Sequence, residues 1–217
     1  MLIPLKFIGL DKLKKERTKK KKGIKEKYNA TSFFYDKRYG NIQFQKYNEI
    51  IHSEDLEKTL IFDAGCGTGL LSEYFQKMLD SADQIDFKYV GVDISIQMIQ
   101  IFKKKLEKIH KKVSNKYSLI LADLENLPIR KNSFNLLISI TSYQNLPDMK
   151  KGFGESLGVL KNNSSIIISI LKKKLENKKF LSFLEDKMEI LKIIDDQRIE
   201  DIIIKGIKIP NSPLKNT

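Results

Sequence analysis

Three glycines at alternate positions, Gly65, Gly67 and Gly69, follow a short apolar run that ends in Asp63. Glycine adopts backbone angles that a Cβ would obstruct, and its bare backbone lets a ligand approach closely at a helix N-terminus. The dinucleotide-binding fingerprint has the pattern G-x-G-x-x-G/A. Counted from Gly65, its third small residue would fall at position 70, where this chain has Leu70. The carboxylate ahead of the glycines would repel a pyrophosphate but suits an ammonium group. The segment therefore predicts a nucleotide-type ligand with a cationic group, and makes a nicotinamide enzyme the least favoured alternative.

Two further acids follow the next two β-like runs of the chain. Asp93 ends the second run, where its carboxylate could accept hydrogen bonds from both hydroxyls of a ribose. Its simpler alternative is a charge that the dipole of the following helix favours. Asp123 follows the third run and could accept the exocyclic amine of an adenine ring. Three apolar side chains could pack on the faces of that ring: Ile94, Met98 and Leu124.

Strand-like and helix-like segments alternate along the chain, which places these acids at one edge of a sheet. Short β-branched runs predict strands at 60–62, 87–92, 117–121, 134–140 and 165–171, with a closing hairpin at 189–194 and 201–207. Helical spacing marks 71–79, 96–109, 150–160 and 175–188. Such alternation implies a parallel sheet covered by helices on both faces, with an antiparallel member at one edge. Ligands of doubly wound sheets bind at the carboxyl ends of the strands.

Taken together, these segments resemble the class I S-adenosylmethionine (SAM)-dependent methyltransferases in their small seven-strand form. The similarity runs from about Tyr35 to the C-terminus. It implies a three-layer α/β/α, Rossmann-like fold with strand order 3-2-1-4-5-7-6 and the last strand antiparallel. It also implies SAM as cofactor and S-adenosylhomocysteine as product. The cofactor contacts that it implies are Asp63, Gly65, Cys66, Gly67, Gly69, Asp93, Ile94, Met98, Asp123, Leu124 and Ile140.

The segment after the fourth strand, 141–147, usually shapes the acceptor site in this family. The motif typical of amine-methylating members is absent, and Cys66, the single cysteine, lies in the cofactor loop rather than at a nucleophile position. His52 and His110 fall outside the strand ends. Without a general base, transfer rests on positioning, which suits an acceptor with a free lone pair or one that ionises easily. Side chains that could orient such an acceptor, or simply cap the strand, are Tyr143, Gln144 and Asn145.

The run 138–146 looks most like the corresponding stretch of rRNA guanine-N7 methyltransferases. Some of those enzymes work with a small zinc-ribbon activator subunit docked on an edge strand, so the resemblance implies such a partner. They carry a basic C-terminal extension, however, whereas the basic run here lies at the opposite end. Between Lys12 and Lys27, ten lysine or arginine residues face two glutamates, a local charge of +8 out of +13 for the chain.

This basic run predicts either an arm that attracts RNA or a solvated tail. We expect four regions: the basic arm at 1–27, a helical lid segment at 28–56, the methyltransferase domain at 57–209, and a tail at 210–217. The aromatic segment at 30–51 could cover the ligand edge of the sheet or pack on the core as an ordinary helix. The domain assignment makes the basic run an appendage to the catalytic unit.

Composition excludes other classes of protein. No apolar run approaches the roughly 20 residues that cross a bilayer. The lysine-rich N-terminus is a poor signal peptide, and one cysteine fits a reducing compartment, so we expect a cytoplasmic protein without membrane insertion or a metal site. The leading hypothesis is methyl transfer from SAM to an rRNA or tRNA base. The alternatives are a small-molecule acceptor, such as a quinone precursor, and a non-catalytic SAM-fold binding subunit.

Overall fold

The chain folds around a seven-stranded sheet, and the computed structural model describes residues 5–51, 56–79, 86–109, 111–175 and 179–210. The strands are β1 (Thr59–Ala64), β2 (Phe87–Asp93), β3 (Tyr117–Leu121), β4 (Phe134–Ile140), β5 (Leu160–Leu171), β6 (Met188–Ile194) and β7 (Asp201–Lys208). Their order is β3-β2-β1-β4-β5-β7-β6. The pairs from β3 to β5 are parallel, whereas β7 runs antiparallel to both β5 and β6. The predicted fold class and strand order are confirmed.

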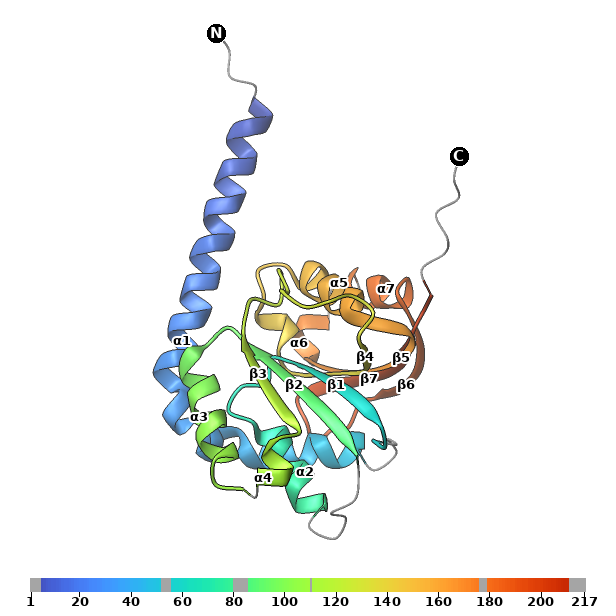
Figure 1. Ribbon diagram of the computed structural model, residues 1–217. Coiled ribbons are helices and arrows are strands. Elements are labelled where there is room, and N and C mark those ends of the chain that lie inside the picture. The colour runs from blue at the N-terminus through green and yellow to red at the C-terminus, as the bar shows by residue number, and fades with distance from the viewer. Residues whose placement is uncertain (1–4, 52–55, 80–85, 110, 176–178, 211–217) are drawn as a thin grey trace.

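Helices cover both faces of this sheet (Figure 1). One layer holds α1 (Leu5–Ile51), α2 (Leu70–Leu79), α3 (Ile96–Leu106) and the single turn α4 (Lys111–Ser114). The other holds α5 (Met149–Val159), α6 (Lys172–Leu175) and α7 (Lys179–Glu185), with the 3₁₀ turn η1 (Tyr143–Asn145) leading into it. Two buried clusters fill the spaces between the layers, one on each side of the sheet.

Alternation along the central strands divides their side chains between the two clusters. In β1, Ile61 joins the cluster beneath α1, α2 and α3, and its neighbour Phe62 joins the cluster beneath α5 and α7. Both side chains have no exposed surface, as expected for a parallel sheet buried on both faces. This double burial explains why the strands are almost wholly apolar and why their positions could be predicted.

Helix N-caps fix where the chain leaves the strand ends. The Ser95 hydroxyl accepts the Met98 backbone N–H at 3.2 Å and begins α3. Asp148 begins α5 in the same way, because its carboxylate accepts the Lys151 N–H at 3.0 Å. Such caps satisfy amides that have no partner within the helix. They hold the turns beside the strand ends in a defined conformation.

The largest difference from the expected organisation is helix α1. The expected basic arm and lid segment are one continuous helix from Leu5 to Ile51 (Figure 1). Of the expected helix at 175–188, α7 covers 179–185 and positions 176–178 lie outside the described residues. Met188 instead begins β6, where it is buried and pairs with Lys208. His52, His110 and nearly all of the predicted tail at 210–217 lie outside the described residues.

The described helices contain no segment that is long and apolar enough to span a membrane. The N-terminal half of α1 projects beyond the sheet, and its C-terminal half packs against α2 and α3 (Figure 1). This arrangement places one side of α1 over the carboxyl ends of the strands. The functional site is built at that edge.

Candidate functional site

The glycine-rich loop after β1 uses its glycines for different purposes. Gly65, Gly67 and Gly69 all have positive φ, a conformation that L side chains rarely adopt. A Cβ on Gly65 would overlap the Ser142 hydroxyl, and one on Gly69 would overlap the Phe102 ring. A Cβ on Gly67 would meet nothing within 4 Å. Two glycines therefore permit close packing, and Gly67 leaves space that a ligand can fill.

Asp93 ends β2 directly beside this loop. One carboxylate oxygen accepts the Gly67 N–H at 3.1 Å, and the other accepts the Ser95 N–H at 2.8 Å. Burial raises the pKa of Asp93, although these backbone N–H groups act against the rise. The carboxylate thus lies between the loop and the start of α3. Each of its oxygens can accept a further hydrogen bond.

Asp123 follows β3 and faces a lysine from α1. The Lys21 ammonium lies 2.5 Å from Asp123 and 2.8 Å from Glu125. Burial acts to raise the pKa of Asp123, but the hydrogen bonds from Lys21 and the Glu125 N–H outweigh it and hold that pKa below its ordinary value. Lys21 therefore stands where the sequence predicted the amine of an adenine ring.

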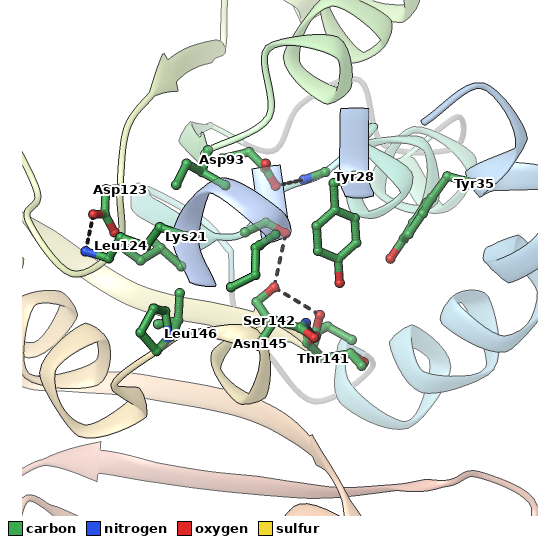
Figure 2. Close-up of a pocket in the computed structure, with 16 residues that line it drawn as sticks. Lys21, Tyr28, Tyr35, Asp93, Asp123, Leu124, Thr141, Ser142, Asn145 and Leu146 are labelled. Carbon is green, nitrogen blue, oxygen red and sulfur yellow. Dashed lines mark hydrogen bonds and ion pairs between the residues drawn. The ribbon is translucent and has the colours of Figure 1, made fainter. Parts of the chain in front are cut away.

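A cavity of roughly 700 Å³, including its open mouth, joins these groups (Figure 2). That volume lies within the range of small-molecule sites. Its outer wall is one side of α1, formed by Lys21, Ile24, Tyr28 and Tyr35, whose spacing of three, four and seven residues matches one helix face. Lysines on all sides of this helix conceal that face in the sequence. The remaining lining residues are Gly65, Gly67, Asp93, Ile94, Asp123, Leu124, Ile140, Thr141, Ser142, Asn145, Leu146 and Pro147.

A smaller cavity continues from the large one beneath the glycine loop. It shares Tyr35, Gly65, Gly67 and Ile140 with the large cavity, and Asp63 is among its other lining residues. The Asp63 carboxylate is buried and accepts a hydrogen bond from the Tyr89 hydroxyl. Burial raises the pKa of Asp63 to about 7. No described lysine or arginine forms an ion pair with this carboxylate.

At the far end of the large cavity, Thr141 adopts a left-handed conformation with φ of +60°. For a β-branched residue this conformation is strained, and it persists only where the surroundings hold it. The Thr141 hydroxyl donates to Asp201 at 2.7 Å and accepts from Lys46 at 2.8 Å, and the Thr141 N–H donates to the Ser169 hydroxyl at 3.0 Å. Lys46 and Asp201 form an almost fully buried ion pair at 2.9 Å. This network holds the wall of the cavity beside Ile140.

The structure brings together most of the residues that the sequence predicted. Ile94, Leu124, Ile140 and Asn145 line the large cavity, and Cys66 lines the small one. Three of the others lie elsewhere. The Tyr143 ring is fully buried and packs edge-on against Phe153 in the core. Gln144 and Met98 are buried too, and neither lines these two cavities.

Polar contacts tie α1 to the turns that carry the site. Asp36 accepts a hydrogen bond from Thr68 in the glycine loop, and Asn29 accepts from the Ser95 hydroxyl at 2.6 Å. Sequence reasoning missed this, because contacts between residues so far apart in the chain leave no local pattern. The aromatic residues at 30–51 were the only signal that this segment could cover the ligand edge.

The described groups fit a ligand with a ribose, an adenine and a charged amino acid portion. Asp93 presents two acceptors beside the glycine loop, and Ile94 and Leu124 line the same cavity as the acceptor Asp123. Asp63, a buried carboxylate with no cationic partner among the described residues, suits an ammonium group. These groups match the chemistry of SAM. No group of three or more metal-ligating side chains occurs in the described residues.

Comparison with known proteins decides the family. Residues 62–168 match the family model described as "Methyltransferase domain". An uncharacterised protein of Methanocaldococcus jannaschii is 32% identical over 157 residues, which cover 70% of this chain and 53% of that protein. The malonyl-[acyl-carrier protein] O-methyltransferase of Hamiltonella defensa is 30% identical over 117 residues, covering 54% and 40%. Residues 62–168 therefore form a methyltransferase domain, and the fold is that of the class I SAM-dependent methyltransferases.

Solved structures of low sequence identity share the fold of this chain. Magnesium protoporphyrin IX methyltransferase from Synechocystis, solved with bound SAM, superposes with a TM-score of 0.67 at 19% identity, covering 87% of this chain and 97% of that one. A chain from the Haloferax volcanii complex of the Trm112 methyltransferase activator with a methyltransferase gives 0.66 at 14% identity, covering 84% and 98%. SAM is the cofactor of this family. The chain spans about half the length of the curated relatives that it matches.

Proposed function

We propose that this methyltransferase transfers the methyl group of SAM to a base of rRNA or tRNA. The observation that supports methyl transfer is the meeting of the glycine loop, Asp93 and Asp123 around one cavity. Asp93 would hold the ribose hydroxyls. Asp123, which Lys21 contacts in this structure, would accept the adenine amine in place of the lysine, with Ile94 and Leu124 against the ring. SAM supplies an electrophilic methyl group on a sulfonium. The protein has to bind it, orient the acceptor and exclude water.

The ionisable groups of the cavity favour an acceptor that needs no general base. Among its described lining residues, the ionisable side chains other than Asp93 and Asp123 are Lys21, Tyr28 and Tyr35. Burial raises the pKa of Tyr28 to about 12 and that of Tyr35 further, so neither phenol takes up a proton from an acceptor at neutral pH. Positioning can then supply the rate enhancement, as it does for oriented reactants held in contact. A nitrogen with a free lone pair, such as guanine N7, meets this requirement.

Within the cavity, Asn145 is the predicted acceptor-orienting residue that we retain. Its side-chain amide donates to the Thr141 carbonyl at 3.0 Å, which fixes the amide beside Ile140. Tyr28 and Tyr35 lie across the cavity with ring centroids 6.4 Å apart in an edge arrangement (Figure 2). A planar base could pack against these rings.

Support for an RNA acceptor comes from the outer surface of α1. Every residue from 13 to 20 is exposed, and the lysines at 19–22 follow one another directly, so positive charge surrounds the helix. Farther along, Phe33 is 85% exposed and Phe34 66% exposed, close to Lys37 and Arg38. Exposed aromatic rings among cations can stack on the bases of a single strand while the cations contact phosphate.

A small-molecule acceptor is the alternative, and a different observation favours it. One side of α1 covers the cavity with Ile24, Tyr28 and Tyr35, as a lid over a compact substrate would. Two matched proteins have names that specify non-RNA acceptors, the malonyl-acyl-carrier-protein and magnesium-protoporphyrin enzymes. In this alternative the lysines of α1 have no part in the reaction.

An activator subunit fits the free edge of β3. Within the described residues, β3 pairs with β2 on one side and with no strand on the other. Leu121, at its end, is 48% exposed, two residues before Asp123. A partner that adds a strand here would bind main-chain groups and reach the cofactor edge of the sheet. The Haloferax complex with the Trm112 activator supports such a subunit as the partner.

Calorimetry with S-adenosylhomocysteine tests the cofactor assignment. Wild-type protein should bind, whereas Asp93→Asn should lose at least 10-fold in affinity, because an amide replaces one of the two acceptors. Circular dichroism checks that the variant remains folded. Unchanged binding by Asp93→Asn would contradict the assignment of Asp93.

Methyl transfer from radiolabelled SAM to separated RNA, protein and small-molecule fractions tests the acceptor. Label in RNA, reduced when Phe33 and Phe34 are both replaced by serine, is the expected result. Label confined to the small-molecule fraction would support the alternative. The assay should be run with and without a zinc-ribbon activator, since the proposal expects the subunit to raise the rate.

A further inference from the structure

Gln43 is a buried polar residue of α1 whose side chain is incompletely bonded. It is 5% exposed, and its Oε1 has no hydrogen-bond donor in the structure. Leaving a buried acceptor unpaired costs about 1–3 kcal/mol, so native proteins rarely do so without a reason. The roles given above to the glycine loop and to the acids after the strands do not explain why a glutamine is buried at this position. Its position on α1 lies between Tyr35 and Tyr47, which also line the small cavity.

The unpaired Gln43 side chain lines the same small cavity as Asp63. This cavity of about 350 Å³ lies beneath the glycine loop, and Gly65 and Gly67 separate it from the sites of Asp93 and Asp123. Two residues that carry oxygen acceptors therefore line it, Asp63 with a carboxylate and Gln43 with an amide carbonyl. Apolar residues such as Leu70 and Leu71 form much of its remaining wall.

The chemistry of these two acceptors selects a cationic donor. Asp63 receives one hydrogen bond from Tyr89, and Gln43 Oε1 receives none. A neutral hydroxyl could satisfy one of them, but an ammonium has three donors and also compensates the buried carboxylate. Anions are disfavoured, because Asp63 and the Gln43 oxygen would repel them.

We propose that Gln43 binds the ammonium of the methionine portion of SAM together with Asp63. This inference rests on the proposed function, since it names a further contact for the same cofactor. It makes α1 a part of the cofactor site at the methionine end, in addition to its role over the large cavity. Through this contact, cofactor binding stabilises the docked position of α1.

Gln43→Leu tests the proposal, because it removes the acceptor while keeping a similar volume. The ligands are S-adenosylhomocysteine, which carries the ammonium, and 5′-methylthioadenosine, which has adenine and ribose but no amino acid portion. Calorimetry should give about 10-fold weaker binding of S-adenosylhomocysteine by the variant, as expected for the loss of one hydrogen bond to a charged group. The affinity for 5′-methylthioadenosine should stay within about 2-fold of wild type, because that ligand does not reach Gln43.

Stability separates a binding role from a structural one. A residue kept for packing destabilises the protein when replaced. Leucine at position 43 also removes the Gln43 contact with the Tyr35 phenol, but it relieves the unpaired Oε1, so the ligand-free midpoint of thermal unfolding should change little. Gln43→Met, which is unbranched and close in shape, repeats the measurement if leucine prevents folding. Gln45→Leu is the matched control, because Gln45 belongs to the same helix but lies outside the small cavity and should alter neither affinity.

The outcomes distinguish this inference from the proposed function. If wild-type protein binds neither ligand, the cofactor assignment itself fails. If it binds both, and Gln43→Leu and Gln43→Met retain full affinity for S-adenosylhomocysteine, the role of Gln43 is overturned while the function stands. Equal losses for both ligands, or a lower unfolding midpoint in both variants, would make Gln43 a structural residue and would also overturn the inference.

Discussion

At the scale of single residues, Asp63 links stability to pH. Its pKa of about 7 exceeds the ordinary 3.8, so near neutral pH the folded protein keeps a proton that the unfolded chain has lost. The stability that this group contributes is fully present below about pH 4 and is lost as pH rises to about 7. Asp63→Asn should remove this dependence. The unfolding free energy of the variant minus that of the wild type should therefore increase from about pH 5 to about pH 8. Urea denaturation at both values measures it, and an equal difference at both would contradict the assignment.

Binding of the cofactor should expel the same proton. An ammonium beside Asp63 favours the ionised carboxylate and lowers its pKa. At about pH 6 we expect binding of S-adenosylhomocysteine to release a proton, which calorimetry detects in two buffers of different ionisation enthalpy. Asp63→Asn provides the comparison, because it has no proton to release. Equal buffer dependence for both proteins would place the proton elsewhere.

The glycines of the loop should respond differently to the same substitution. A Cβ at Gly69 would overlap Phe102, so Gly69→Ala should lower the unfolding free energy by about 2 kcal/mol or more through overpacking and backbone strain. Gly67→Ala adds a Cβ in open space and should cost about 1 kcal/mol, while weakening S-adenosylhomocysteine binding. Chemical denaturation and calorimetry on both variants test the contrast. A larger loss of stability in Gly67→Ala would refute it.

At the scale of elements, the ion pair between Lys46 and Asp201 joins α1 to β7. Both side chains are almost fully buried, and Asp201 also accepts hydrogen bonds from Thr141 and Ser169. Lys46→Met should lower the unfolding free energy by about 3–5 kcal/mol, because it leaves an uncompensated buried charge. The double variant with Asp201→Asn should be less destabilised than Lys46→Met alone. Urea denaturation of the wild type, Lys46→Met and the double variant gives their unfolding free energies. A lower unfolding free energy for the double variant than for Lys46→Met would contradict the prediction.

At the scale of the whole molecule, the uneven charge should govern RNA affinity. Exposed lysines of α1 lie at the carboxyl edge of the sheet, whereas the end of α3 and α4 lie at the opposite edge (Figure 1). Four alanines in α1 should weaken RNA binding and flatten its salt dependence, by about 0.7 in logarithmic slope for each phosphate that a lysine no longer neutralises. The positions are Lys14, Lys15, Lys19 and Lys22.

Matched alanines at the opposite edge control for net charge. These are Lys103, Lys104, Lys108 and Lys111. If the proposal holds, they change affinity and slope far less than the substitutions in α1. Filter binding at several salt concentrations gives both quantities. Equal effects from the two sets would mean that RNA responds only to total charge and that α1 forms no binding surface.

The sequence by itself determined the sheet and the edge of it at which three acids meet. Strands buried on both faces must be apolar, and acids that follow parallel strands must meet at one edge, so local patterns were sufficient to predict Asp63, Asp93 and Asp123. Only the tertiary structure decided what covers that edge. Contacts such as Lys21 with Asp123 and Lys46 with Asp201 join residues about 100 or more positions apart, and no local period records them.

The same limit applies to side chains whose direction depends on packing. Tyr143 and Asn145 both suit an acceptor site by residue type, yet one ring is buried against Phe153 and the other side chain lines the cavity. A short turn directs neighbouring side chains to different sides, and the available space selects which faces the core. The glycine loop indicated the ligand class from the sequence. The folded chain decided that α1 lines both cavities at that edge, with Lys21 in the large one and Gln43 in the small one.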